Sequence, residues 1–451
     1  MDKITKLEPF RGEQFNSAFN IVERLRSSGY KAFFVGGCVR DTVMGIPPKE
    51  YDIATSASPE EIMRLFSNTV PIGASFGVIL VLQDECKFEL ATFRQDERYT
   101  DGRHPDRVIY TSSEKEDVTR RDFTINGMLY DPITEEVIDY VGGIEDIKNG
   151  IIRTIGNSYE RFNEDKLRMI RAIRFGARFN YEIEEETLHA IRKLAYRISD
   201  VSTERVREEI VKIITQKNPG VGLLLLRETG LLSHMLPEVD KMFGIPQPPE
   251  FHPEGDVFTH TCLILDKVFE ITEGNTTLEL SVGGLLHDVG KPVTFSIEDR
   301  IRFNAHDRIG AEMAEKICKR LRFSNKEIER IKALVSEHLR FKDVFNMKES
   351  TLKRFLGMPY FEDHLILHLA DCLASHGSIE AYDFVKKKLE GFKEEEIKPK
   401  PILTGYDLIE MGYTPGPIFS EILESLEEVQ LEGTVKDKEE AKKFVLERFP
   451  I

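Results

Sequence analysis

Cysteine is scarce in this sequence and is never arranged in a motif. Five cysteines occur among 451 residues, at positions 38, 86, 262, 318 and 372. The count is odd and no two of them form a Cys-x-x-Cys pair, which argues against a disulfide framework and against a zinc ribbon. We therefore expect small core residues with reduced thiols, in a cytoplasmic protein.

Long apolar runs and a basic charge balance are also missing. No uncharged stretch reaches the roughly 18 apolar residues that a membrane span needs, so we expect no membrane partner. The charged segment 1–15 lacks the apolar core of a signal peptide. The formal net charge of −16 argues against non-specific nucleic-acid binding. Basic side chains nevertheless outnumber acidic ones between residues 161 and 178, a local stripe that fits a selective phosphate contact.

The hydrophobic patterns divide the chain into a mixed part and a helical part. Strand and helix patterns alternate as far as residue 148 and predict an α/β head with a mixed sheet, whereas helical periodicity prevails beyond it. A proline-rich segment at 245–249 marks a boundary, and the charge run 386–400 reads as a linker. The predicted domains are 1–148, 149–240, 241–385 and 386–451. The predicted strands are 32–35, 51–54, 78–82 and 88–93, and the predicted helices include 1–30, one beginning at Ser58-Pro59, 164–179, 185–196, 203–215, 258–272, 278–286, 309–321, 326–338 and 360–374.

A glycine pair follows the first predicted strand, in the sequence Phe-Phe-Val-Gly36-Gly37-Cys-Val-Arg40. Glycines at such a position let backbone N–H groups approach an anion closely. Arg40 can then meet phosphate oxygens through its planar guanidinium. The pair by itself is also compatible with a simple tight turn from strand to helix.

Two carboxylates, Glu50 and Asp52, come next, one residue apart. Side chains at i and i+2 of a strand point to the same face, so this pair could bind Mg²⁺ for phosphoryl transfer. Glu89, on the strand 88–93, could bind a second ion or take the proton from an attacking hydroxyl. A surface carboxylate is the alternative interpretation of Glu89.

The segment Arg-Arg121-Asp122-Phe-Thr-Ile-Asn126 concentrates charge that is costly to bury for packing alone. Arg121 could hold a triphosphate, and Asp122 and Asn126 could position the arginine or a ribose hydroxyl. An ion pair at the protein surface is the alternative.

Asp165, Arg168 and Arg171 are three residues apart, which predicts one helical face. An acceptor beside a donor can read the Watson–Crick edge of cytosine or adenine, because both present an amino donor and a ring-nitrogen acceptor there. Guanine and uracil have the opposite polarity and would leave buried groups unpaired. An amphipathic helix with ion pairs along it is the structural alternative.

Taken together and in order, GGCVRD, EYDIAT, RRDFTING, EDKLRMIRAIRF and the segment 202–205 resemble the class II tRNA nucleotidyltransferases and bacterial poly(A) polymerases. The resemblance is strong over residues 30–235 and weaker towards the C-terminus. It implies a head, neck, body and tail, with catalysis in the head and base selection in the neck. The catalytic residues that we expect in the head are Asp52, Glu50 and Glu89. The nucleotide contacts that it implies are Gly37, Arg40, Arg121, Asp165, Arg168, Arg171 and Arg174.

One position departs from the family's pattern, and one further segment resembles it. Glu50 stands where the family usually has aspartate, and the extra methylene makes Asp52 the more secure metal ligand because Mg²⁺ demands strict geometry. The segment 99–105 resembles the family's flexible loop, which is associated with the switch from C to A addition.

A second cluster of metal-ligand residue types lies in the helical half of the chain. Histidine and aspartate together suit a divalent transition metal with open positions for water and phosphate. The order of His260, His287-Asp288 and Asp371 resembles the HD phosphohydrolase superfamily, which implies that these four residues bind the metal. His306 and His338 are expected as further ligands or phosphate contacts, and Lys291 near a phosphate. A retained fold with a vestigial site is the alternative.

The sequence thus predicts template-independent addition of CCA to tRNA 3′ ends from CTP and ATP, with Mg²⁺ in the head and tRNA as the partner. A CC-adding enzyme, an A-adding enzyme and a poly(A) polymerase remain alternatives. A further alternative is an HD phosphohydrolase with a degenerate transferase head.

Overall fold

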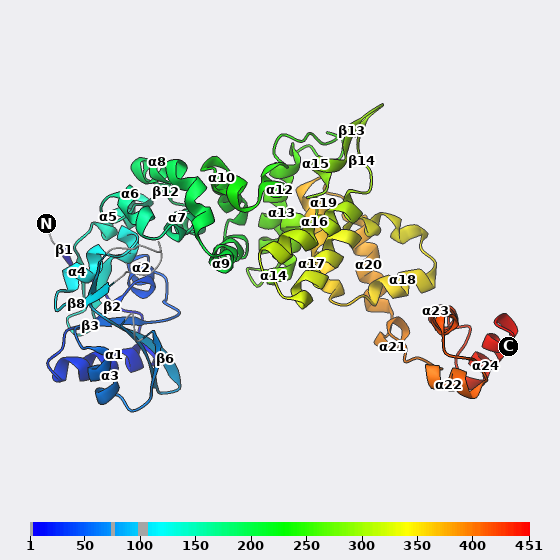
Figure 1. Ribbon diagram of the computed structural model, residues 1–451, viewed down its shortest axis with the longest axis horizontal. Coiled ribbons are helices and arrows are strands. Elements are labelled where there is room, and N and C mark those ends of the chain that lie inside the picture. The colour runs from blue at the N-terminus through cyan, green and yellow to red at the C-terminus, as the bar shows by residue number, and fades with distance from the viewer. Residues whose placement is uncertain (1–2, 74–76, 98–106) are drawn as a thin grey trace. The chain divides into compact units, whose positions relative to one another are not determined.

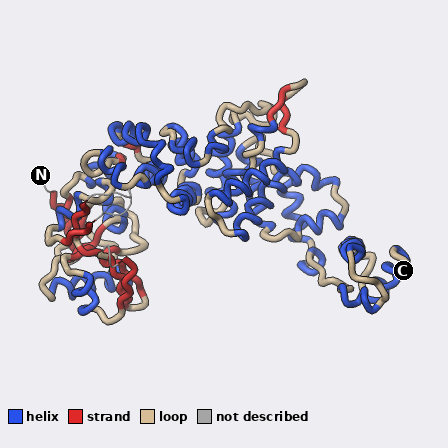
Figure 2. The backbone as a smooth tube through the Cα atoms, in the orientation of Figure 1, coloured by secondary structure: helices blue, strands red, loops and turns tan. Residues whose placement is uncertain are grey.

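The computed structural model describes residues 3–73, 77–97 and 107–451 (Figure 1). The chain divides into two compact units, Met1–Asp240 and Lys241–Ile451. This division coincides with one of the three expected domain boundaries; the other two stay predictions. Strands are concentrated in the first unit and helices prevail elsewhere, which confirms the expected fold class (Figure 2). Within the described ranges, no helix is both long and apolar enough to cross a bilayer.

A mixed eight-stranded sheet forms the centre of the head. Its order is β1-β10-β9-β2-β3-β6-β5-β4; β3 and β6 are parallel and the other neighbours are antiparallel. Every residue of β2 is buried, as expected for a central strand that is covered on both faces. The strands are β1 Lys3–Lys6, β2 Ala32–Val35, β3 Asp52–Thr55, β4 Thr69–Gly73, β5 Val78–Gln83, β6 Cys86–Thr92, β9 Met128–Asp131 and β10 Glu136–Asp139.

Helices pack beside this sheet, and their starts follow from local sequence. Helix α3 begins with a capping box, because the Ser58 side chain accepts from the Glu61 N–H and the Glu61 carboxylate accepts from the Ser58 N–H. The helices are α1 Glu13–Ser27, α2 Gly37–Val43, α3 Pro59–Leu65, α4 Glu114–Thr119 and α5 Gly143–Asn149. A separate hairpin joins β7 Arg94–Glu97 to β8 Arg107–Tyr110. The expected flexible segment 99–105 lies outside the described residues.

The expected helix over 1–30 is wrong at its N-terminal end. Lys3–Lys6 is instead strand β1, which pairs with β10 through partners such as Lys3 and Asp139. Helix α1 begins only at Glu13. The strand forms because β10 offers a free edge, a tertiary contact that local periodicity does not contain.

The neck is helical, and its central helices pack on one another. Helix α7 lies against α9 and α10. The elements are β11 Ile151–Ile152, α6 Ser158–Glu164, α7 Leu167–Phe179, β12 Glu182–Ile183, α8 Glu185–Leu194, α9 Thr203–Ile214, α10 Pro219–Glu228, α11 Leu231–Met235 and α12 Pro237–Asp240.

The single helix expected over 164–179 is interrupted. Asp165 is extended, with φ −140° and ψ 108°. Its Oδ1 accepts from the Leu167 N–H at 3.0 Å, so the side chain serves the start of α7 as a local cap. Asp165 therefore precedes the helix that carries Arg168 and Arg171, and does not share its face by helical spacing.

The second unit is almost entirely helical, and a short hairpin projects from it (Figure 1). Helix α20 runs across the expected boundary at 385/386 and buries Val385, so the charge run 386–400 is partly helical and not simply a linker. The elements are α13 Val257–Ile271, α14 Leu278–Leu286, α15 Lys291–Thr294, β13 Phe295–Ile297, β14 Ile301–Phe303, α16 His306–Arg320, α17 Asn325–Glu337, η4 His338–Asn346, α18 Glu349–Leu356, α19 Phe361–Ala374, α20 Glu380–Gly391, α21 Glu394–Ile397, α22 Gly405–Glu410, α23 Pro417–Leu431 and α24 Lys438–Arg448.

The C-terminal helices enclose a small core of their own, centred on Leu408, Ile422 and Leu426. This tail is joined to α18 by polar contacts as well. The buried ammonium of Lys353 donates to the Leu431 carbonyl at 2.9 Å. The tail therefore packs on the preceding helices of the same unit.

Candidate nucleotide pocket and metal centre

A pocket of about 420 Å³ opens in the first unit between the head and the start of α7. It gathers the glycine turn, the arginine-rich segment after α4 and residues of the neck. Its lining consists of Gly36, Gly37, Arg40, Asp52, Arg120, Arg121, Asp122, Asn126, Asp165, Leu167, Arg168, Arg171, Phe175 and Arg205. Six of the seven expected nucleotide contacts are thus brought together.

The glycine turn sets the spacing of the pocket. Gly36 has φ 73°, a conformation that favours glycine. A Cβ atom at this position would lie 3.7 Å from Asp52 Oδ2 and 3.8 Å from an Arg121 Nη1, so the chain turns directly between a carboxylate and a guanidinium. Arg40, one turn further on, is buried and donates to Asn126 Oδ1 at 2.8 Å and to Asp41 Oδ1 at 2.7 Å.

Three carboxylates lie near one another beside this turn. The parallel register pairs Ile53 with Leu90, and one residue earlier it places Asp52 beside Glu89 on the same face of the sheet. Burial, followed by the charges of Glu89 and Glu50, raises the pKa of Asp52 to about 6, although Arg121 acts in the opposite direction. A carboxylate crowded by other carboxylates fits a divalent cation, which would relieve the repulsion.

Glu50 does not lie where the strand argument placed it. Strand β3 begins at Asp52, so Glu50 precedes it and is exposed. Its charge still acts on Asp52. Neither Glu50 nor Glu89 is among the described residues that line the pocket itself.

Two aspartates, the buried Asp117 and the half-buried Asp122, hold arginines of the pocket in place. Asp117 is fully buried and accepts from Arg120 at 2.6 Å and from Arg121 at 2.9 Å. Asp122 accepts from Arg171 Nε and Nη2 at 2.9 and 2.6 Å. Burial alone would raise the pKa of Asp122, but Arg171, together with Arg168 and Asn126, outweighs burial and lowers this pKa to about 2. These ion pairs preorganise a positively charged wall.

Both residues expected to read the base already have protein partners. Asp165 accepts from Arg205 at 2.7 and 3.3 Å. Arg168 donates to Glu164 Oε2 and to the Arg161 carbonyl. A carboxylate has about four lone-pair sites, so a carboxylate held by an arginine keeps acceptor capacity for a ligand. The spacing of residues does not predict that Arg205 pairs with Asp165. The one indication in the sequence is that Arg205 belongs to the segment 202–205, which resembles the family.

Arg174, the remaining expected nucleotide contact, is outside the described lining of the pocket. It is buried, and its Nε donates to Glu209 Oε2 on α9 at 2.7 Å. The guanidinium also lies 4.3 Å from the ring centre of Phe175, which does line the pocket. Arg174 thus contacts the pocket indirectly, through the ring of Phe175.

The second unit brings all six expected metal-site residues together, from five helices and the turns beside them. His287 Nε2 lies 3.1 Å from Asp288 Oδ2, and His306 Nε2 lies 3.4 Å from Asp288 Oδ1. His338 Nε2 is 3.8 Å from the same Oδ1. On the other side, His260 Nε2 is 3.2 Å from Asp371 Oδ1.

Glycine at position 290 makes this convergence possible. A Cβ atom there would lie 2.2 Å from the His306 carbonyl oxygen, so any side chain would push the start of α16 away. The sequence Asp288-Val-Gly290-Lys291 therefore serves packing as well as chemistry.

Each histidine of this centre is oriented through its other ring nitrogen. Nδ1 lies 2.6 Å from Glu254 Oε1 in His260, and 2.7 to 2.8 Å from a backbone carbonyl in His287, His306 and His338. An Nδ1–H that donates outward leaves Nε2 with a lone pair towards the centre.

The inward-facing atoms have the character of metal ligands. Nε2 of His260, His287 and His306 is buried and has no hydrogen-bond partner among the residues that the structure describes. Among the described residues, three groups of ligand atoms are compact enough for an ion: His260, His287 and Asp371; Asp288, His306 and His338; and His252, Glu254 and His260. Buried nitrogen atoms without hydrogen-bond partners in the described chain, arranged with carboxylate oxygens in this way, fit the ligands of a divalent transition metal.

The loop before α13 adds contacts that sequence reasoning missed. Glu254 Oε1 accepts from both His252 and His260. Gln247 Oε1 accepts from Lys291 Nζ at 2.6 Å, and that ammonium lies 2.7 Å from Asp288 Oδ2. In the sequence, the prolines of the segment 245–249 indicate only a domain boundary and not a contribution to this centre.

Three family models match the chain. They are the poly A polymerase head domain over residues 32–153, the probable RNA and SrmB-binding site of polymerase A over 180–243, and the HD domain over 257–375.

Curated relatives are similar over about half of the chain. The CCA-adding enzyme of Ligilactobacillus salivarius is 42% identical over 239 residues, which cover 53% of this chain and 59% of the relative. The CCA-adding enzyme of Enterococcus faecalis is 44% identical over 216 residues, which cover 48% and 53%. The matched segments therefore span less than two thirds of these relatives.

Solved structures are similar over nearly the whole chain. The Bacillus stearothermophilus CCA-adding enzyme in complex with CTP is 25% identical, with a TM-score of 0.77 over 97% of this chain and 98% of the other. The Thermotoga maritima CCA-adding enzyme complexed with tRNA is 20% identical, with a TM-score of 0.62 over 99% of both chains, and shares the fold.

Proposed function

We propose that the chain is a class II tRNA nucleotidyltransferase that completes tRNA 3′ ends with CCA. The matches to a poly A polymerase head domain, an RNA-binding domain and an HD domain, and the similarity to CCA-adding enzymes, support this proposal. CTP and ATP are the donors, pyrophosphate is released and no nucleic-acid template is used. The observation that carries the proposal is that one pocket of the first unit combines Asp52, an arginine wall and the pair Asp165 and Arg168. The cytoplasmic location that we propose rests on the five cysteines, which are all free.

The triphosphate would lie against the glycine turn and the arginines. The Gly37 backbone, Arg40 and Arg121 bind its oxygens, and Arg171 adds positive charge from α7. Asp117 and Asp122 keep two of these arginines from swinging into solvent. Binding and orientation of this kind supply much of the rate in phosphoryl transfer.

The carboxylates would hold the cation and handle the proton. Asp52, with Glu50 and Glu89, would bind Mg²⁺, which supplies charge neutralisation at the α-phosphate when bound. Glu89 lies beside Asp52 by strand register and would accept the proton of the tRNA 3′-hydroxyl as this oxygen attacks the α-phosphorus. The bond from phosphorus to the bridging oxygen of pyrophosphate breaks in the same displacement.

Base choice would rest on Asp165 and Arg168. Asp165, held by Arg205, presents acceptor oxygens to the amino group of cytosine or adenine, and Arg168 donates to the neighbouring ring nitrogen. Guanine and uracil would place a carbonyl oxygen against the Asp165 carboxylate and a ring N–H against the Arg168 guanidinium. Leaving such groups unpaired costs about 1–3 kcal/mol each, enough to exclude them.

One assay separates the transferase alternatives. The purified chain is given tRNA transcripts that end one, two or three nucleotides short of CCA, with CTP and ATP singly and together. We expect completion of every transcript. If a transcript that ends in CC receives no A, the protein is a CC-adding enzyme. If only A is ever added, it is an A-adding enzyme. Long A tails on arbitrary RNA would identify a poly(A) polymerase.

A second activity is favoured by the buried imidazole nitrogens of the other unit. We propose that His260, His287, Asp288 and Asp371 hold a divalent transition metal for hydrolysis of phosphomonoesters or cyclic phosphodiesters. Asp288→Ala should remove hydrolysis and leave incorporation, and Asp52→Ala should do the reverse. Hydrolysis without incorporation by the unmodified chain would instead indicate a degenerate transferase head.

A further inference from the structure

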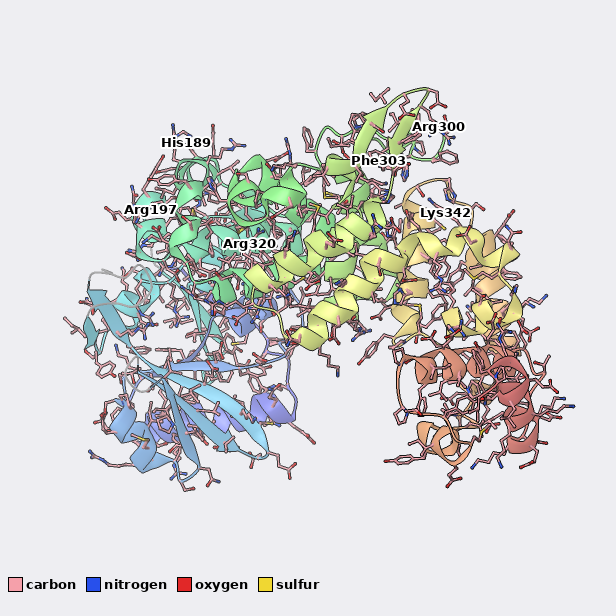
Figure 3. All side chains as sticks on the ribbon, turned by 45° about the vertical axis from the view of Figure 1, so that its right-hand side comes forward. His189, Arg197, Arg300, Phe303, Arg320 and Lys342 are labelled. Carbon is pink, nitrogen blue, oxygen red and sulfur yellow. The ribbon has the colours of Figure 1, made fainter. Side chains whose placement is uncertain are left out.

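A glutamine from the loop before α13 is buried beside the histidine-rich centre, although it is no part of the expected metal site. Gln247 is 4% exposed and Lys291 is 6% exposed. Lys291 begins α15, which leads into the β13–β14 hairpin, and its ammonium lies 5.3 Å from the ring centre of Phe303. Phe303 lies at the base of that hairpin (Figure 3). Polar side chains so deeply buried require a stated partner for each polar atom.

Lys291 links this glutamine to the centre. Its Nζ donates to Gln247 Oε1 at 2.6 Å and lies 2.7 Å from Asp288 Oδ2. An ammonium has three N–H donors, so these two contacts leave one for a further acceptor. The pair therefore lies directly beside the carboxylate that the histidines surround.

The orientation of the amide follows from the same contact. Oε1 must face the ammonium, because rotation of the amide by 180° would set an NH₂ group against an NH₃⁺ group. Nε2 is thereby fixed on the other side of the amide. It is buried and has no acceptor within the described parts of the chain.

We propose that Gln247 Nε2 and Lys291 Nζ form an oxyanion subsite that receives a phosphoryl oxygen of the compound hydrolysed at the centre. This inference rests on the proposed phosphohydrolase activity and deepens it. The ligand must be an acceptor for a neutral and a charged donor at once, and must extend a further oxygen towards the histidines and Asp288. A phosphate monoester or cyclic phosphodiester group has the required number of oxygens and the required charge.

The amide has two roles that substitution can separate. Gln247→Glu keeps an acceptor for Lys291 but removes the Nε2 donor, and Gln247→Leu removes both. Gln430→Leu is the matched control, because this glutamine donates to the exposed Lys400 carbonyl in the tail of the same unit.

The probe is inorganic phosphate, titrated calorimetrically into the full chain loaded with Mn²⁺, after Mn²⁺ affinity has been measured for each variant. We expect phosphate affinity to fall about tenfold in Gln247→Leu and at least as far in Gln247→Glu, as for loss of one hydrogen bond to a charged group. Mn²⁺ affinity should stay within about twofold, and Gln430→Leu should match the unmodified chain in both titrations.

Unchanged phosphate affinity in both Gln247 variants would overturn the proposal, because Nε2 would then bind only water. Loss of phosphate and Mn²⁺ binding together would also overturn it, since the amide would only support the metal site. Failure of the unmodified, Mn²⁺-loaded chain to bind phosphate would do the same. If phosphate binding depends on Gln247 but no phosphate ester is hydrolysed, the subsite stands and the proposed hydrolase activity fails.

Discussion

Replacement of Asp52 by asparagine should stabilise the metal-free protein while it abolishes nucleotide incorporation. Burial, Glu89 and Glu50 raise the pKa of Asp52 from 3.8 to about 6. Each pKa unit corresponds to about 1.4 kcal/mol between the two protonation states. Above pH 6 the ionised carboxylate therefore costs the folded chain about 3 kcal/mol. The pKa of about 6 already includes the attraction of Arg121, so asparagine removes the net cost and we expect a gain of up to about 3 kcal/mol.

The dependence on pH has a definite sign. Between about pH 4 and pH 6 the folded chain keeps a proton on Asp52 that the unfolded chain has lost, so the free energy of unfolding falls as pH rises through this window. Above it the contribution is constant. The stability difference between Asp52→Asn and the unmodified chain should be largest at pH 7–8 and should close towards pH 4.

Calorimetric melting of the full chain in a chelator, at pH 4.5 and pH 7.5, measures this difference as a shift in Tm of about 2–4 °C per kcal/mol. Asp131→Asn is the matched control, because Asp131 accepts from Arg26 at 2.7 Å in the same head and its loss should lower the Tm. Added Mg²⁺ should raise the Tm of the unmodified chain and leave that of Asp52→Asn unchanged. A variant no more stable than the unmodified chain at pH 7.5, or a difference that does not vary with pH, would refute the reasoning.

Three further substitutions test the supporting contacts. Arg205→Ala removes the partner of Asp165, so discrimination of CTP against GTP and UTP, measured as the ratio of kcat/KM values, should fall about tenfold; an unchanged ratio would contradict the positioning role. Glu254→Gln weakens the anchor of His260, and Mn²⁺ affinity measured by calorimetry should fall about 10–100-fold, whereas full affinity would show that the anchor is dispensable. Lys353→Met leaves the carbonyl at the end of α23 without its buried donor at a cost of about 1–3 kcal/mol; limited proteolysis should then cut the tail faster, and an unchanged cleavage rate would argue against this contact as a fastening.

Elements with a strong local signal could be predicted from the sequence. The apolar strand β2 and the capped start of α3 at Ser58 lie where the patterns placed them. The residues of the histidine-rich centre could also be named, because their order resembles the HD phosphohydrolase superfamily, and the structure brings them close to one another.

Features that depend on distant partners could not be predicted. Lys3–Lys6 becomes a strand only because β10 offers an edge. The break at Asp165 depends on a side chain that caps the next helix and pairs with Arg205, forty residues away. Arg174 has the same helical spacing as its neighbours, and its ion pair with Glu209 on another helix is not contained in that spacing; its contact with the nucleotide stays a prediction. Spacing alone cannot tell a contact with a ligand from a contact with the protein.

The anchoring of the histidines has a consequence for how this centre can change. In His287, His306 and His338 the outer ring nitrogen is held by a main-chain carbonyl, which no substitution can delete while the helices stand. In His260 it is held by the Glu254 side chain. A single mutation can therefore remove the hydrogen bond that orients His260, but not those that orient the other three histidines. Any redesign of the metal preference of this centre should start at Glu254.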